Sequence, residues 1–509
     1  MTGAVPEYIS ADGPLSGVET RIVRNAAALM ASQLTTWALA LVLAVVLPRY
    51  LGPRAVGELQ LATTVWTIVF SVVAFGSEMM LTKEIARRPQ QAARRLCTVI
   101  LLRLIFFVGG CLAVSLYIGA VTADSVQVSL FVILGMAQPL LLTANVLQAA
   151  LQGFQRMQSI AVATVISKAL YTLMALLAVI AGFNVKWVAV ATVIGNAAHL
   201  CALTVCLFPV VRANWRWGFS IRTARWSIVA SAPFLASALL VIAYQETSVI
   251  VIAMVLDAQA VGWFSVARTL TATLLFIPAI LMTAVYPAAA KRHLEGAQVL
   301  PALAARSVKL MLLCAMPIAL GVAVTAEPIV SLLYGDKFLP SGAVLMVLGL
   351  SLIATYQTIV LAFLLAAVDR QATWVTIQAV ALPVKIFLDL ALVWSCQNFL
   401  ENGAVGAAIS IAVSEAAIAV AGMRLLPKGT LSRADAGYGA RVAFAALTMA
   451  AAVWLVRDTS LFLAVLAGVV VYIGMIAAMR AADPDDVALM KSVISRTAAR
   501  ASLRRRVSE

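Results

Sequence analysis

Charged residues are scarce in this chain of 509 residues: Asp, Glu, Lys and Arg make up 12% of it, and hydrophobic residues make up 63%. A soluble domain carries about 25% charged residues, so the chain lacks the side chains that a water-facing surface requires. Its apolar runs are continuous and about 20–28 residues long, the length of a helix that spans a bilayer. They do not alternate with polar residues, as the strands of an outer-membrane barrel do. We therefore expect an all-α, multi-pass membrane protein.

Metal-binding and redox motifs are also lacking. The chain has only two histidines, His199 and His293, and its six cysteines show no Cys-x-x-Cys spacing. The cysteines lie in or beside apolar segments, where cysteine acts as a small buried hydrophobe. We expect no metal site and no disulfide. The chain also lacks a nucleotide-binding glycine motif, and its first 20 residues contain no apolar segment typical of a cleaved signal peptide.

Turn residues and charges divide the apolar sequence into about fourteen spans. They are expected at 25–47, 58–82, 94–121, 126–150, 157–181, 186–208, 226–254, 260–287, 303–333, 340–367, 371–395, 402–424, 437–456 and 460–480.

Basic residues are concentrated in every second connection between these spans. Of the 37 Lys and Arg residues, 28 lie in or beside one set of connections and the two tails. The opposite set contains only five, which are Arg49, Arg54, Lys186, Lys337 and Arg457. This bias follows the positive-inside rule and predicts that both termini are cytoplasmic. The net charge of +15 thus reflects topology and contact with membrane lipids, not nucleic acid.

Two short stretches of the chain recur in register. "AVGELQLA" at 55–62 matches "AVGWFSVA" at 260–267, and "VLQAALQGFQR" at 146–156 matches "VLAFLLAAVDR" at 360–370. Six spans separate the two copies of each, so the copies enter the membrane with the same orientation. This pattern predicts two parallel six-helix repeats, which in transporters are related by an axis along the membrane normal.

The repeats define the predicted domain organisation. Residues 1–24 form a cytoplasmic tail, 25–208 an N-lobe of helices 1–6, and 226–424 a C-lobe of helices 7–12. Two further helices follow at 437–480, and a basic tail at 483–509 is expected to form an amphipathic helix on the cytoplasmic leaflet, with a solvated tail as the alternative.

Several motifs resemble those of the bacterial polysaccharide and O-antigen flippases. They are "YLGPRAVGELQLA" with the following "GSEMMLTKEIARRP", and in the second half "EPIVSLLYGDKF" and "LLAAVDRQ". This Wzx-like family belongs to the superfamily of multidrug, oligosaccharidyl-lipid and polysaccharide exporters. The resemblance covers nearly the whole chain.

The resemblance implies a non-enzymatic flippase of the bacterial inner membrane that moves an undecaprenyl-diphosphate-linked oligosaccharide by alternating access. Its partners would be this anionic substrate, membrane lipids, a polysaccharide polymerase and a chain-length regulator. No cofactor is expected, and coupling to a proton or sodium gradient stays open. The alternatives are a cation-coupled multidrug extruder of the same superfamily and a glycan polymerase or ligase. The second alternative normally requires a sizeable outer loop, which this chain lacks.

Charged residues inside apolar spans are the candidate site residues, because burying a charge in a membrane is costly. Arg268, Lys168 and Lys385 are predicted to bind the anionic substrate. Lys168 and Lys385 occupy equivalent positions in the two repeats. An ion pair of Lys385 with its i+4 neighbour Asp389 is the structural alternative for that lysine.

Acidic and aromatic partners complete the candidate set. His199, Glu415 and Asp389 are predicted to support the lysines or to couple ion movement. Glu246 is predicted to hold Arg268 when the site is empty, and a permanent salt bridge between them is the alternative. Glu78 and Arg103 flank a cytoplasmic turn and are expected to form a structural pair.

Overall fold

The computed structural model describes residues 15–121, 124–211, 218–282, 299–426, 430, 433–457 and 459–479. These residues are helical apart from short turns, and they include no strand. Thirteen of the described segments are long and apolar enough to cross a membrane. The first has 59 residues and contains the first two predicted spans, so the predicted all-α fold with about fourteen spans is confirmed.

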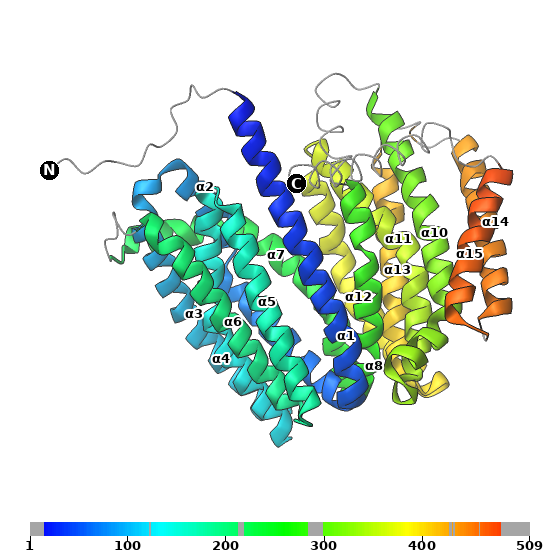
Figure 1. Ribbon diagram of the computed structural model, residues 1–509, viewed down its shortest axis with the longest axis horizontal. Coiled ribbons are helices and arrows are strands. Elements are labelled where there is room, and N and C mark those ends of the chain that lie inside the picture. Colours follow the sequence, from blue (N-terminus) through cyan, green and yellow to red (C-terminus); the bar gives the residue numbers. More distant parts are fainter. Residues whose placement is uncertain are drawn as a thin grey trace, which may run out of the picture. The chain divides into compact units, whose positions relative to one another are not determined.

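The helices follow the predicted spans closely (Figure 1). In chain order they are α1 Leu15–Ala74, α2 Ser77–Arg87, η1 Pro89–Gln91, α3 Ala92–Val121, α4 Ser125–Gly153, α5 Met157–Ile180, α6 Val185–Val211, α7 Ile221–Val255, α8 Ala258–Leu274, α10 Val299–Tyr334, η3 Asp336–Phe338, α11 Pro340–Ala367, α12 Gln371–Leu400, α13 Gly403–Arg424, α14 Arg433–Val456 and α15 Leu461–Ala478.

Helix α1 joins two predicted spans across a sharp bend. It begins at Leu15, ten residues before the predicted span, and bends at Gly52, whose φ of 80° and ψ of 167° are not helical. Glycine adopts a positive φ without steric cost, and the following Pro53 resumes the helix with its fixed φ. The sequence "LGP" therefore bends the chain here without a separate loop.

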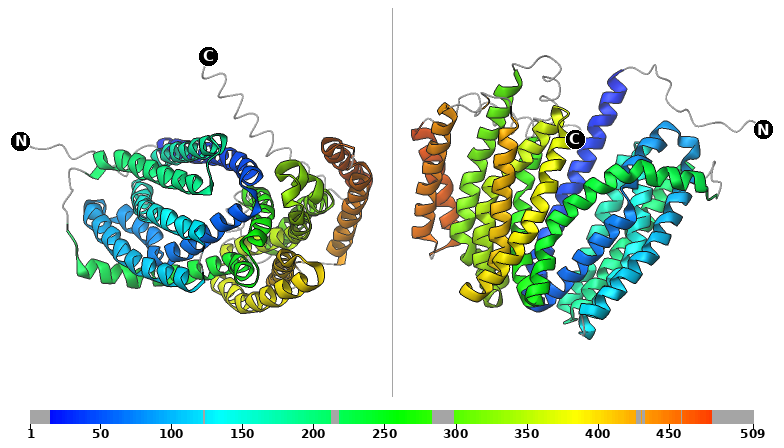
Figure 2. Two further views of the ribbon diagram at one scale, coloured as in Figure 1. Left: turned by 90° about the horizontal axis from the view of Figure 1, so that it is seen from below. Right: turned by 180° about the vertical axis from the view of Figure 1, so that it is seen from behind.

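The chain divides into two compact units, Met1–Ala253 and Met254–Glu509. Almost all of α7 belongs to the first unit, although the sequence repeat assigns it to the second half. Ala224 of α7 lies in a buried cluster with Leu96 of α3 and Leu147 of α4, and Leu235 packs against the same cluster. Figure 2 shows α7, in green, curving over the other helices of this unit.

The two units pack corresponding pairs of helices. In the first unit α4 packs against α3 and α6, and α5 packs against α6. In the second unit α11 packs against α10 and α13, and α12 packs against α13. The appended helices α14 and α15 pack against each other and against α10.

The second sequence match ends in the same backbone turn in both copies. Gln155 and Asp369 each have a φ of 58° and directly precede an arginine. The Arg156 amide donates to the Leu151 carbonyl at 2.9 Å, and the Arg370 amide donates to the Leu365 carbonyl at 2.9 Å. The repeat is therefore present in the backbone conformation as well as in the sequence.

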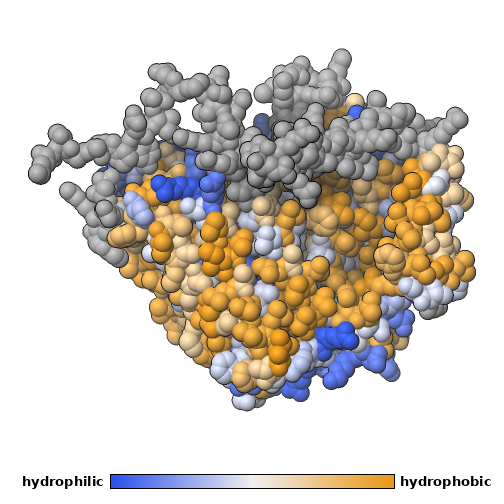
Figure 3. All heavy atoms as spheres, viewed as in Figure 1, coloured by the Kyte–Doolittle hydropathy of each residue, from blue (hydrophilic) through white to orange (hydrophobic). Residues whose placement is uncertain are grey.

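Large apolar side chains cover the outer faces of the helices. Leu116 is 76% exposed, Phe399 82% and Phe462 77%. On the face drawn in Figure 3, hydrophobic side chains occupy most of the visible described surface. An apolar surface of this extent is unfavourable in water and favourable in contact with lipid tails, so these faces meet the membrane interior.

Candidate functional site

A cavity of about 430 Å³ lies within the first unit and is lined by α1, α4, α5 and α6. Each helix contributes residues that recur at helical spacing and therefore share one face. The lining residues are Leu59, Thr63, Thr67 and Phe70 from α1, Leu134, Gln138 and Leu141 from α4, Ser167, Lys168 and Tyr171 from α5, and Thr192, Gly195 and Asn196 from α6.

Most polar groups of this lining already bond to their own helix or to a neighbour. The hydroxyls of Thr63 and Thr67 donate to backbone carbonyls of α1 at 2.7 and 2.8 Å. Asn196 Nδ2 donates to the Ala137 carbonyl of α4 at 3.4 Å. Their remaining lone pairs and amide groups line a cavity with both polar and apolar walls, which suits ligands that carry hydroxyls.

Lys168 is the one cation among the described residues that line this cavity. It is exposed, and its ammonium forms no ion pair or hydrogen bond with a described residue. Its Nζ lies 5.9 Å from the centroid of the Tyr171 ring, one turn along α5, within the range of a cation–π contact. An uncompensated ammonium at the wall of a membrane-embedded cavity is a counter-charge for an anion.

A close approach of α6 to α5 positions this face. A Cβ added to Gly195 would lie 2.8 Å from the Tyr171 Cβ, so only glycine fits there. His199, one turn further along α6, is buried and interacts electrostatically with Lys168. The structure thus brings together two predicted site residues, Lys168 and His199.

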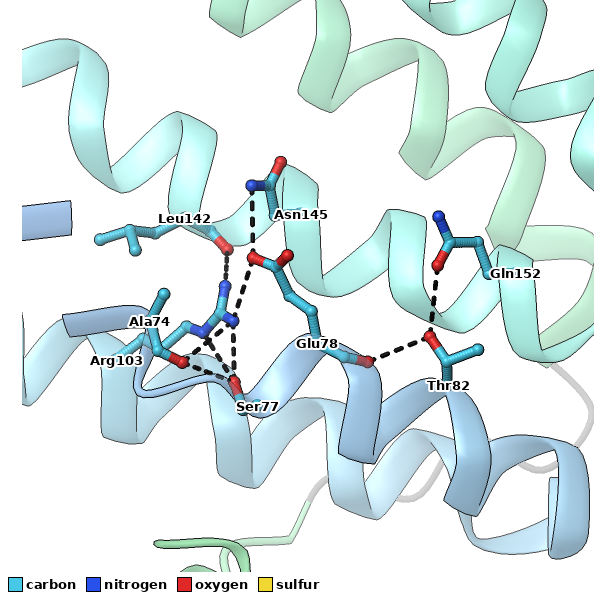
Figure 4. A network of polar contacts seen from close by, with 8 residues as sticks. All are labelled: Ala74, Ser77, Glu78, Thr82, Arg103, Leu142, Asn145 and Gln152. Atoms are coloured by element: carbon cyan, nitrogen blue, oxygen red, sulfur yellow. Dashed lines mark hydrogen bonds and ion pairs between the residues drawn. The ribbon is translucent and has the colours of Figure 1, made fainter. Parts of the chain in front are cut away.

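Arg103 occupies a separate polar network at the break between α1 and α2 (Figure 4). Only 1% of its side chain is exposed. Its guanidinium donates to the Leu142 carbonyl at 3.0 Å, to the Ala74 carbonyl at 3.3 Å and to Ser77 Oγ at 2.7 Å. Glu78 Oε1 accepts from Arg103 at 3.4 Å.

The break itself explains why an arginine lies there. Phe75 and Gly76 have φ values of 40° and 63°, and the chain turns from α1 into α2. The Ala74 carbonyl at this break lacks a helical partner and is costly to leave unpaired in a membrane protein. Ser77 Oγ donates to this carbonyl at 2.9 Å and the Arg103 guanidinium at 3.3 Å, so the predicted pair of Arg103 with Glu78 forms part of a network that stabilises the fold.

The predicted site residues of the second unit lie on α12 or interact with it. Lys385 Nζ lies 2.7 Å from Asp389 Oδ2, and their side chains are 1% and 0% exposed. Glu415 of α13 and Arg268 of α8 interact electrostatically with the Lys385 ammonium. Lys385 therefore differs from Lys168, because its charge is compensated inside the bundle by the i+4 neighbour that the sequence offered as the structural alternative.

Two predicted acidic residues accept hydrogen bonds from buried threonines. Glu415 Oε2 accepts from Thr358 Oγ1 at 2.8 Å within the second unit. Glu246 Oε2 of α7 accepts from Thr64 Oγ1 of α1 at 2.8 Å within the first unit. The predicted partner of Glu246, Arg268, belongs to the second unit.

Sequence reasoning missed the uncharged part of the cavity lining. Thr63, Thr67, Gln138 and Asn196 carry no charge, and polar residues of this kind are common on membrane helices. Their signal is the i, i+4 spacing of Thr63 with Thr67 and of Thr192 with Asn196, which places each pair on one helix face. The predicted amphipathic tail helix at 483–509 lies outside the described residues.

Comparison with known families gives one match. The sequence model of the family described as polysaccharide biosynthesis protein matches residues 22–293, which is more than half of the chain. No match was found among the curated proteins.

Several solved structures of transporters have the same fold. The lipid II flippase MurJ, in an inward closed conformation, is 13% identical with a TM-score of 0.72, and the match covers 90% of this chain and 98% of that one. An inward-facing multidrug resistance transporter of the MATE family and MOP superfamily is 16% identical with a TM-score of 0.56, covering 77% and 93%. The eukaryotic MATE transporter AtDTX14 is 13% identical with a TM-score of 0.56, covering 84% and 98%.

Proposed function

Because the chain belongs to the polysaccharide biosynthesis protein family, we propose that it is a flippase for an undecaprenyl-diphosphate-linked oligosaccharide. It would act in the bacterial inner membrane with both termini in the cytoplasm, as the distribution of Lys and Arg predicts. The fold that it shares with a lipid II flippase and with multidrug transporters supports this class of activity.

The observation that carries the proposal is Lys168 in its cavity. A lipid-linked oligosaccharide presents a diphosphate and many hydroxyls to the protein while its tail stays in lipid. Lys168 offers an uncompensated cation for phosphate oxygens, and Gln138 and Asn196 beside it offer amides for hydroxyls. The arrangement matches the chemistry of the substrate headgroup.

Transport would follow an alternating-access cycle. Parallel repeats in transporters allow one half to rock against the other, so that a site opens to each side of the membrane in turn. Arg268, which interacts with the charges around Lys385 in the second unit, is the cation proposed to bind the diphosphate there. Lys385 itself is proposed to stabilise the second unit through Asp389.

The multidrug extruder is the weaker candidate. A cationic drug requires carboxylates in its binding cavity, and none of the described residues that line the cavity around Lys168 is acidic. The ammonium of Lys168 would repel a cationic ligand at the same place. The lining therefore favours an anionic substrate.

Replacing Lys168 tests the proposal. Undecaprenyl diphosphate binding to the purified protein is measured for wild type, Lys168→Ala and Lys168→Arg. Loss of a charged hydrogen bond costs about 1.5–3 kcal/mol, so Lys168→Ala is expected to raise Kd roughly 10-fold or more. Lys168→Arg retains the charge and should keep most of the affinity.

Lys186→Ala is the matched control, because Lys186 begins α6 without lining the cavity. It should bind undecaprenyl diphosphate as the wild type does. Glycan export in cells that carry only the variant gene gives the functional readout, at equal protein level. Normal binding and normal export by Lys168→Ala would contradict the proposed role of this lysine.

A further inference from the structure

A second cavity, of about 660 Å³, lies at the end of the first unit where three apolar segments begin or end. Its lining residues come from the end of α2, the turn into α3 and the first turns of α7. It shares no lining residue with the cavity around Lys168. Because the ends of membrane-spanning helices lie at the depth of lipid headgroups, this cavity faces the headgroup layer.

Arginine dominates the charge of this second cavity. Among the described residues, Arg88, Arg94, Arg95 and Arg222 line it together with one carboxylate, that of Glu84. The side chains of Arg88, Arg94 and Arg222 are exposed, and none of the three makes a hydrogen bond or ion pair with a described residue. Three arginines that make no ion pair with a described residue therefore line one cavity.

Arg95 and Trp226 form an ordered wall of the cavity. Arg95 is 9% exposed, makes an ion pair with Glu84 and donates to Gln91 Oε1 at 3.1 Å. Its guanidinium lies 5.5 Å from the centroid of the Trp226 ring, which is 42% exposed. Tryptophan is enriched at the boundary between headgroups and hydrocarbon, where it anchors membrane proteins. The charge of Arg95 is thus compensated by Glu84, whereas Arg88, Arg94 and Arg222 are available to bind a ligand.

From this arrangement we infer that the second cavity binds the phosphate of an anionic membrane lipid such as phosphatidylglycerol. Guanidinium groups bind phosphate oxygens in bidentate geometry, and exposed arginines on different elements can contact one phosphate together. The lipid would join the turn between α2 and α3 to the start of α7. The site depends on a position in a membrane and not on the transport function proposed above.

Lipid retention by the purified protein tests the inference. Native mass spectrometry counts the phosphatidylglycerol molecules retained by wild type and by Arg88→Gln/Arg94→Gln/Arg222→Gln. The wild type is expected to retain at least one lipid that this variant loses. The matched control is Lys83→Gln/Arg87→Gln/Arg225→Gln, which removes three exposed cations from the same region that do not line the cavity. It should retain the lipid.

Further measurements distinguish a site for a lipid phosphate from a site for a soluble phosphate. The proposed site would be overturned if the wild type and the cavity variant retained the same number of lipids. It would also be overturned if the cavity variant and the control variant lost the lipid equally. Phosphatidylcholine retained by the wild type as well as phosphatidylglycerol would refute selectivity for anionic lipid. Displacement of the lipid by millimolar inorganic phosphate or glycerol phosphate would instead identify a site for soluble phosphates. If the triple variant does not purify as a folded protein, Arg88→Gln and Arg222→Gln are measured singly, and each should weaken retention.

Discussion

The sequence predicts that Lys168 and Lys385 are equivalent in the two repeats, yet their surroundings differ. Lys168 is exposed to a polar cavity and has no described anionic partner. Lys385 is buried against Asp389 at 2.7 Å. An ammonium and a carboxylate that compensate each other contribute little charge to a ligand, whereas removal of either leaves the other buried and unpaired. The neighbouring residues thus distinguish the two lysines.

The Lys385–Asp389 pair gives a prediction about stability. Lys385→Met alone leaves the Asp389 carboxylate unpaired in the bundle, and breaking such a pair costs about 3–5 kcal/mol. The double variant Lys385→Met/Asp389→Leu removes both charges and should recover most of the lost stability. Thermal unfolding of the purified variants in detergent measures both effects.

A ligand role for Lys385 predicts a loss of substrate binding in place of a loss of stability. The double variant would then fold normally but fail to bind undecaprenyl diphosphate. Normal stability of Lys385→Met alone would likewise show that the pair does not stabilise the second unit.

The close contact between α5 and α6 depends on a glycine, which has no side chain. A Cβ on Gly195 would lie 2.8 Å from Tyr171 Cβ and 3.4 Å from the Ser167 carbonyl oxygen, so α5 and α6 touch at the level of the cavity. Small residues at helix interfaces are how membrane helices approach closely enough for dispersion contacts to hold them together. The same contact positions Tyr171, and with it Lys168, at the cavity wall.

Gly195→Ala is expected to separate these two helices and to lower both thermal stability and undecaprenyl diphosphate affinity. Clashes in a packed interface typically cost about 1–3 kcal/mol. The matched control is Gly119→Ala in α3, where an added Cβ has no atom within 4 Å. Alanine is favoured over glycine in a helix, so this control should be as stable as the wild type or slightly more stable. Equal stability of the two variants would show that α5 and α6 are not closely packed at Gly195.

Orientation in the membrane is a property of the whole molecule that the distribution of charge predicts. Arg87 lies at the end of α2 in a basic connection, and Phe183 lies in the turn between α5 and α6, which belongs to the opposite set of connections. Lys and Arg near the ends of spans are retained on the cytoplasmic side. The two positions should therefore face opposite sides of the membrane.

Single cysteines at these positions test the orientation in a background that lacks the six native cysteines. An impermeant maleimide added to intact spheroplasts should label Phe183→Cys and not Arg87→Cys. Permeabilised cells should label both. Labelling of Arg87→Cys from outside would reverse the proposed topology.

Most of the secondary structure follows from the sequence. Long apolar runs bounded by glycine, proline and charge have one stable form in a bilayer, because a helix satisfies every backbone hydrogen bond within itself. The predicted span 340–367 is α11 residue for residue, and the predicted 371–395 differs from α12 only at its end. The second repeated motif ends in a backbone turn that recurs at Gln155 and Asp369, in agreement with the predicted repeat. Composition, periodicity and repetition are local properties of the sequence, so they determined the local structure, which is the helices and their turns.

Tertiary structure alone decided which polar residues meet. The sequence marked Lys168 and Lys385 as equivalents and offered Asp389 as an i+4 partner of Lys385, but only packing placed Lys168 at a cavity and buried the Lys385–Asp389 pair inside the bundle. Likewise only packing placed Arg103 at the Ala74 carbonyl and brought Arg222 of α7 to the same cavity as Arg88 and Arg94. The physical reason is that in a membrane helix nearly every face is apolar, so hydrophobicity does not specify which face turns inward. Close contacts at small residues and the pairing of buried polar groups make that choice, and both depend on neighbours far away in the chain.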